Sequence, residues 1–122
     1  MYGIFVNEDS FPYAHKIVSG EKTYETRSRN MLKRLNGKRV AIISTRRGQK
    51  PMIIGYAEVF AVTYWSRETL DKFRTLTLIP EGSKYDCTGA GKWCYWMNDA
   101  EPCEPYPLPE NAIRHGRSYV EF

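Results

Sequence analysis

The segment Gly20-Glu21-Lys22-Thr23-Tyr24-Glu25-Thr26-Arg27 places a helix stop and charged side chains of both signs within eight residues. Gly20 stands where a helix C-terminus needs left-handed backbone, which glycine adopts without a Cβ clash. The threonines and the tyrosine that follow favour a strand. Because Glu25 and Arg27 are two residues apart, they share one face of that strand. The segment therefore predicts a helix that passes directly into a strand bearing a carboxylate and a guanidinium on one face.

The residues before this segment predict the helix itself, over Phe11 to Ser19. Ser10 is expected to act as its N-cap, and Pro12 lies in the first turn, where a missing N–H costs nothing. Apolar residues recur at i, i+3 and i+7 from Phe11, through Ala14 and Val18, which marks one buried helix face.

The pattern Gly-x-Lys-x-x-Glu-x-Arg, formed here by Gly20, Lys22, Glu25 and Arg27 after a short helix, resembles the signature of ASCH domains, a branch of the PUA-like superfamily. The resemblance implies an α+β fold, namely a small, mostly antiparallel PUA-like β-barrel with two or three short helices. It also implies that the motif lies in a ligand-binding cleft. Three later segments are similar to the family as well: residues 37–43, 54–59 and 115–122.

The remaining pattern is typical of a single domain over residues 1–122, without repeats or linkers. Ser66 is expected to cap a second helix that runs through Arg74, with Glu68 in its first turn. The strand expected at residues 52–64 is long, so Gly55 predicts a bulge or a bend within it. A glycine-containing loop over residues 78–92 precedes an aromatic strand, and a proline-rich passage follows that strand. The strands are expected at residues 2–6, 23–28, 39–45, 52–64, 93–97 and 118–122.

Bulk properties exclude several classes of protein. No apolar run approaches the roughly 20 residues that cross a bilayer, and the N-terminus lacks the basic region of a signal peptide. Three cysteines, Cys87, Cys94 and Cys103, have no zinc-site spacing. We therefore expect a cytoplasmic protein with reduced thiols, without a metal, a cofactor or a membrane partner, and its oligomeric state stays open.

A basic run follows the motif. The chain has 18 basic and 14 acidic residues, a net charge of +4, and between residues 27 and 50 it has nine basic residues and no acidic one. This run is either ordinary solvated charge or a face that meets phosphates, and we favour the second interpretation. Its members are Arg27, Arg29, Lys33, Arg34, Lys38, Arg39, Arg46, Arg47 and Lys50. Arg114, His115 and Arg117 near the C-terminus would extend such a rim.

The motif residues are the first candidates for chemistry. Held in a cleft, Lys22 would bind a phosphate or carbonyl oxygen, or would act as a base if burial lowered its pKa. Glu25 would orient that lysine, take a proton, or accept hydrogen bonds from a base or sugar hydroxyl. Arg27 offers a planar fork suited to phosphate. The alternative is a purely structural set of ion pairs that ties the strand to the helix end.

Glu58 and the aromatic strand are further candidates. Glu58 lies in a strand that is otherwise almost wholly apolar, so it needs a charged partner, for which Lys22, Arg27 and Arg39 are the options, or a polar pocket. In the strand over residues 93–97, one face must be core, and the other is available to stack on an unpaired base. We name Tyr95 and Trp96 as stacking candidates, Tyr24 as a further binding residue, and Arg39, Arg46 and Arg117 as phosphate-binding ones.

These features predict RNA or nucleotide binding, with single-stranded RNA, a nucleoside or a nucleotide as partner. Relatives in the superfamily include an amidohydrolase that acts on N4-acetylcytidine and proteins reported as ribonucleases, so a hydrolase with Lys22 and Glu25 as catalytic residues is the alternative. The amidohydrolase pattern has threonine where this chain has Glu25. A plain interaction domain is the third hypothesis. The loop Thr88-Gly89-Ala90-Gly91-Lys92 is not a phosphate loop, because Trp93 follows its lysine.

Overall fold

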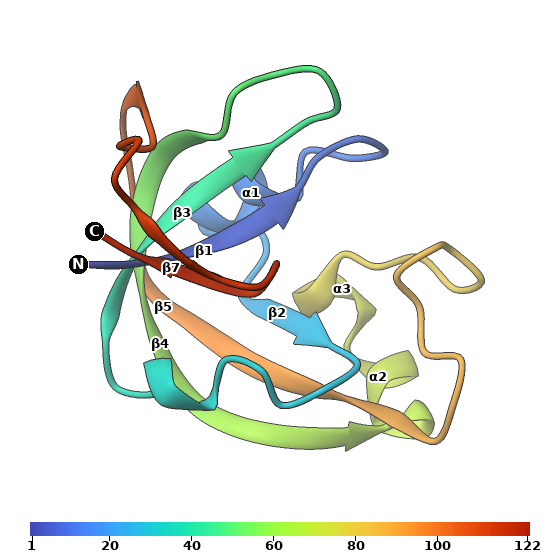
Figure 1. Ribbon diagram of the computed structural model, residues 1–122. Coiled ribbons are helices and arrows are strands. Elements are labelled where there is room, and N and C mark those ends of the chain that lie inside the picture. Colours follow the sequence, from blue (N-terminus) through green and yellow to red (C-terminus); the bar gives the residue numbers. More distant parts are fainter.

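The computed structural model describes residues 1–122 as one curved, seven-stranded mixed sheet with three short α-helices and a 3₁₀ turn (Figure 1). The strand order across the sheet is β2-β5-β4-β3-β1-β7-β6. In chain order the elements are β1 (Tyr2–Asn7), α1 (Tyr13–Val18), β2 (Tyr24–Arg27), η1 (Lys33–Leu35), β3 (Arg39–Thr45), β4 (Met52–Ser66), α2 (Arg67–Lys72), α3 (Arg74–Thr77), β5 (Gly91–Pro107), β6 (Ile113–His115) and β7 (Tyr119–Glu121).

The sheet is mostly antiparallel, as predicted, with a single parallel pair between β1 and β3. The predicted β-barrel is not confirmed, because no backbone ladder joins the edge strands β2 and β6. The two ends of the chain meet instead at the opposite side of the fold, where the amino group of Met1 donates to the carbonyl of Phe122 at 2.8 Å. The open side between β2 and β1 therefore remains available for a pocket.

Bulges bend the two longest strands around the core. The β4–β5 ladder shifts register at three places, and two of them coincide with left-handed residues, Ala61 (φ 50°) and Asp99 (φ 47°). The third lies between Ile53 and Gly55, which confirms the bulge predicted at that glycine. Strand bulges of this kind add twist and bend the sheet.

Strand β5 runs ten residues beyond the predicted end at Met97, through the proline-rich passage to Pro107. Strand β2 pairs with it only from Trp93 to Trp96, so β5 is an edge strand beyond that point. Proline is tolerated on an edge strand because the N–H that it lacks would face solvent.

Helix α1 covers the concave face of the sheet and closes the main core. Its buried residues Ala14, Ile17 and Val18 pack against the inward side chains of β1, β3, β4 and β5. The main core cluster consists of Ile4, Val6, Tyr13, Ala14, Ile17, Val18, Leu32, Leu35, Val40, Ile42, Ile54, Ala57, Val59, Ile79, Tyr95, Met97 and Tyr119. None of the helices is long and apolar enough to span a membrane.

The capping of α1 differs from the prediction. Ser10 lies in a bend before the helix and makes no capping bond, and Pro12 occupies the N-cap position. The buried carboxylate of Glu8, the residue after β1, caps the helix instead, accepting from the backbone N–H of His15 at 3.0 Å. Gly20 follows the helix at φ 84°, as predicted.

The second helix is capped by Ser66, as predicted, and the hydroxyl of this residue accepts from Thr69 N–H at 3.2 Å. Helix α2 ends at Lys72, two residues before the predicted end, and Phe73 separates it from α3.

Replacement of Gly55 tests the close packing of β4 against α1 and β5. A Cβ at this position would lie 2.3 Å from the Glu101 carbonyl oxygen and 2.6 Å from a methyl carbon of Val18. Gly55→Ala should lower the free energy of unfolding in urea by about 2 kcal/mol, within the usual range for overpacking. Gly89→Ala is the matched control, because nothing lies within 4 Å of its added Cβ. Equal stability of the two variants would contradict this packing.

Candidate functional site

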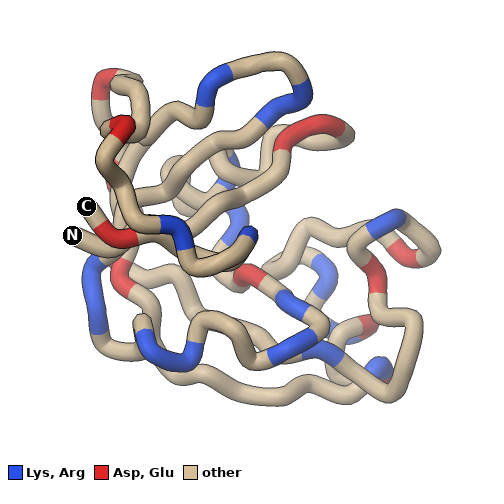
Figure 2. Tube along the Cα trace, in the orientation of Figure 1, with Lys and Arg blue, Asp and Glu red and all other residues tan.

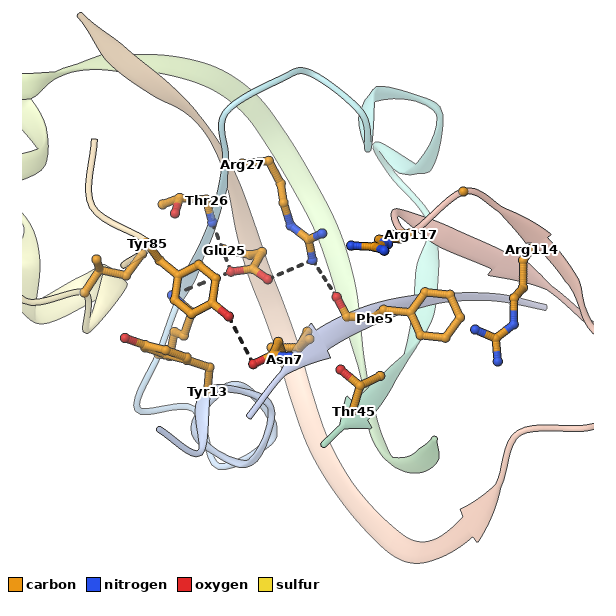
Figure 3. Close-up of a pocket in the computed structure, with 14 residues that line it drawn as sticks. Phe5, Asn7, Tyr13, Glu25, Thr26, Arg27, Thr45, Tyr85, Arg114 and Arg117 are labelled. Carbon is orange, nitrogen blue, oxygen red and sulfur yellow. Dashed lines mark hydrogen bonds and ion pairs between the residues drawn. The ribbon is translucent and has the colours of Figure 1, made fainter. Parts of the chain in front are cut away.

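A pocket of about 320 Å³ opens between the edge strand β2 and strand β1 (Figure 3). Its walls come from elements distant in sequence: β1, α1, β2, the end of β3, the loop before β5, and the β6–β7 turn. The lining residues are Phe5, Val6, Asn7, Tyr13, Lys22, Glu25, Thr26, Arg27, Thr45, Ile79, Tyr85, Arg114, Gly116 and Arg117. The pocket thus gathers the lysine, glutamate and arginine of the motif with two arginines from the C-terminal end.

The turn after α1 directs Lys22 into the protein. The backbone N–H of Lys22 donates to the Lys16 carbonyl at 2.9 Å, and the next residue, Thr23, donates to Leu76 at 3.0 Å. These bonds hold both sides of the lysine backbone, and its side chain is only 1% exposed. The ammonium donates to the Thr77 carbonyl and lies 3.7 Å from a carboxylate oxygen of Glu25.

Burial lowers the pKa of Lys22 from 10.5 to about 8. Loss of hydration disfavours the charged ammonium, the Glu25 carboxylate opposes this effect, and the nearby Lys92 adds to it. Lys92 is a second buried amine, whose ammonium donates to the Tyr85 carbonyl at 2.6 Å, and burial lowers its pKa as well. At neutral pH the Lys22 amine therefore carries a proton in most molecules but releases it more easily than an exposed lysine does.

Glu25 is ionised although it is buried. Burial alone would raise the pKa of its carboxyl, but Arg27 and Lys22, together with the Thr26 N–H that donates at 3.1 Å, hold that pKa below its ordinary value. The Arg27 guanidinium donates to Glu25 at 3.0 Å, as expected for residues on one strand face. The same guanidinium donates to the Phe5 carbonyl at 2.7 Å, which connects β2 to β1 across the open side of the sheet.

The pocket has an excess of positive charge. Four cationic side chains, Lys22, Arg27, Arg114 and Arg117, line it with a single carboxylate, Glu25. In Figure 3, Arg114 and Arg117 lie at one end of the cavity and the Tyr13 and Tyr85 rings at the other. Arginine forks of this kind favour an anionic ligand with several acceptor oxygens, such as a phosphate.

The two tyrosines form an ordered wall. Their rings pack edge to face with centroids 5.8 Å apart, and the Tyr85 hydroxyl donates to Asn7 at 3.0 Å. Tyr13, Tyr85 and Asn7 were not recognised in the sequence, because they come from a helix, a loop and a strand end without a shared motif. Only the fold brings them together.

The aromatic residues predicted to bind the ligand lie outside the pocket. Tyr95 is fully buried in the main core, and its hydroxyl donates to Asn30 at 3.0 Å, so the prediction of a stacking role for Tyr95 is wrong. Tyr24 packs on Trp65 with ring centroids 4.6 Å apart, and Trp96 packs on Phe60 at 6.1 Å. Neither Tyr24 nor Trp96 lines the pocket.

Three charged candidates also lie elsewhere. Glu58 is opposite Arg39 in the β3–β4 ladder, but no basic group lies within 4.0 Å of its carboxylate. Arg39 pairs instead with Glu101 across the sheet. Arg46 lies 3.7 Å from Glu8 and does not line the pocket.

The predicted basic face is divided in the fold. Figure 2 shows the basic residues around η1 and those of the β3–β4 loop on separate parts of the molecule. Of the nine, only Arg27 lines the pocket, whereas Arg117 reaches it from the β6–β7 turn. The structure gathers no group of three or more His, Cys, Asp or Glu side chains that would hold a metal ion.

Comparison with known proteins identifies the fold. A scan against protein-family models finds no match, and a search of curated proteins finds none. Crystal structures of an ASCH protein, ZmASCH from Zymomonas mobilis, are similar. That protein is 24% identical with a TM-score of 0.70, over 87% of this chain and 73% of its own. Its tyrosine-to-phenylalanine variant is 26% identical with a TM-score of 0.69, over 87% and 76%.

A serine-to-alanine variant of the same protein is 23% identical with a TM-score of 0.74, over 96% of this chain and 85% of its own. These similarities define the fold as that of the ASCH branch of PUA-like domains. The structural similarity supports an ASCH-domain protein.

Removal of the buried amine tests its lowered pKa. Between pH 8 and 10.5 the unfolded chain retains a proton on Lys22 that the folded chain has lost. Stability rises with pH wherever the unfolded state binds more protons. The free energy of unfolding of the unaltered protein should therefore rise in this window relative to Lys22→Met, by about 3 kcal/mol in total. Urea unfolding at several pH values measures this difference.

Lys72→Met, on the surface helix α2, is the control. It shows how the loss of an exposed lysine charge changes the free energy of unfolding over the same pH range. A constant difference between the unaltered protein and Lys22→Met from pH 7 to pH 11 would show that the Lys22 amine is not desolvated.

Proposed function

We propose that this protein binds single-stranded RNA or a nucleotide in the pocket around Lys22, Glu25 and Arg27. The observation that carries the proposal is the excess of positive charge, four cationic side chains against one carboxylate in one cavity. Lys22 and Arg27 share the Glu25 carboxylate inside the pocket, whereas Arg114 and Arg117 are exposed at its rim and have no carboxylate partner within 4.0 Å. A phosphate that enters the pocket would supply a negative charge for these two arginines.

The arrangement of the charges suggests the orientation of the ligand. An ionised Glu25 repels a phosphate, so the phosphate belongs at the end that holds Arg114 and Arg117 (Figure 3). The base then extends toward Tyr85, a half-buried ring that the buried Tyr13 supports from behind. A base N–H or a ribose hydroxyl donates to Glu25 in this orientation, which is the kind of contact that distinguishes RNA from DNA.

A hydrolase is the second candidate, and it rests on a separate observation. The Lys22 amine, with a pKa of about 8, lines the same pocket as Thr26, whose hydroxyl is buried without a hydrogen-bond partner. In the neutral fraction of molecules the amine is able to accept a proton from a hydroxyl or from water. Such a site would cleave RNA or remove the acetyl group of N4-acetylcytidine.

Replacement of Arg117 tests the binding proposal. Arg117→Ala should weaken binding of a fluorescent single-stranded RNA roughly tenfold or more, because a hydrogen bond to a charged group contributes about 1.5–3 kcal/mol. The slope of log affinity against log salt should also fall by about 0.7, the contribution of one phosphate contact on a single strand. Fluorescence anisotropy at several salt concentrations measures both. Arg67→Ala on α2 removes an equal charge outside the pocket.

Binding that does not depend on salt, or an equal loss in the two arginine variants, would exclude this pocket as the phosphate site.

Incubation with an RNA oligomer that contains acetylated cytidine separates binding from catalysis. For a binding module we expect the RNA to stay intact by mass spectrometry, and Glu25→Gln to change affinity without a new product. Loss of the acetyl group or a shortened chain, abolished by Glu25→Gln, would establish the hydrolase instead and identify the bond that is broken.

A further inference from the structure

We infer that a second cavity, which adjoins the pocket at Arg114, receives the next nucleotide of the strand, so that the preferred ligand is at least a dinucleotide. This inference rests on the proposed function and specifies its substrate class. The second cavity has a volume of about 380 Å³. It is lined by Lys50, Pro51, Pro107, Leu108, Pro109, Glu110, Ala112 and Arg114.

Arg114 is the wall that the two cavities share. Its guanidinium lies over the Phe5 ring, 5.0 Å from the ring centroid, and Phe5 lines the first pocket. Guanidinium stacking on an aromatic ring holds the group in place while its N–H donors stay free at the edges. Arg114 is therefore placed to contact a phosphodiester that passes from one cavity to the other.

The charge of the second cavity also favours a phosphodiester. Lys50 and Arg114 supply two positive charges, and Glu110 supplies one negative charge. Lys50 is the last member of the basic run that follows the motif, and it lies outside the first pocket. The second cavity thus gives a role to a basic residue that the first pocket leaves unused.

The remaining wall is apolar and ordered in advance. Three prolines and Leu108 line it. The Leu108 N–H donates to the Pro51 carbonyl at 3.1 Å, and the Ala112 N–H donates to Pro109 at 3.1 Å. Proline rings lose no side-chain entropy when a ligand packs on them. The cavity therefore offers a rigid apolar surface to a base or a sugar beside a cationic edge.

Titration calorimetry with three ligands tests the inference: adenosine 5′-monophosphate, adenosine 3′,5′-bisphosphate, and the 5′-phosphorylated dinucleotide of adenosine. The dinucleotide should bind the unaltered protein most tightly. Lys50→Ala should weaken dinucleotide binding roughly three- to fivefold and leave the monophosphate unchanged. Glu110→Gln should strengthen dinucleotide binding. Lys72→Ala, which removes an equal charge on α2, should change neither.

The ligands separate failure of this inference from failure of the proposed function. If the monophosphate binds and the dinucleotide binds no tighter, or if Lys50→Ala weakens all three ligands equally, the second subsite is excluded while the pocket keeps its function. If the bisphosphate equals the dinucleotide, the cavity contacts only the phosphate, and the inference of a second nucleotide is overturned. If no ligand binds, the proposed function fails, and the subsite with it.

Discussion

The buried ion cluster of Lys22, Glu25 and Arg27 is the interaction on which the open side of the sheet depends. Strand β2 pairs only with β5, so its other edge has no backbone partner. The Arg27 guanidinium takes the place of that partner, because it joins the Glu25 carboxylate on β2 to the Phe5 carbonyl on β1. Removing one member of a buried ion pair typically costs about 3–5 kcal/mol. The same three charges thus hold the edge strand in position and define the floor of the pocket.

This arrangement couples stability and ligand binding through the same charged groups. An isolated protein holds Lys22 and Lys92 in surroundings that lower the pKa of both amines, and a single buried carboxylate does not balance them. An anion in the pocket would add the missing counter-charge, so it would stabilise the fold as well as occupy the site. A lysine with a pKa near 8 is mostly protonated at neutral pH, so it adds positive charge to the pocket, and it is also suited to proton transfer. The charges are therefore compatible with anion binding and with proton transfer, and only an assay for a reaction product separates the two.

The local sequence predicted the structure correctly where short-range backbone geometry decides it. Gly20 ends the first helix, Ser66 caps the second, and Glu25 and Arg27 share a strand face. Two predictions were wrong: Glu8, the residue after β1, caps the first helix in place of Ser10, and Tyr95 is a core residue. The local sequence does not show which face of β5 is the core face, because aromatic side chains stand on both faces of this strand.

The sequence by itself determined the family motif and the mostly antiparallel α+β class. It also determined the positions of Lys22, Glu25 and Arg27 relative to one another. These features depend on turn chemistry and on the two-residue period of a strand. Only the tertiary structure decided that the sheet stays open, that the basic run divides, and that Arg114 and Arg117 face the motif. The reason is distance along the chain: Arg27 and Arg117 are separated by 90 residues. Their approach follows from the strand order and the bulges of β4 and β5, which no local pattern encodes.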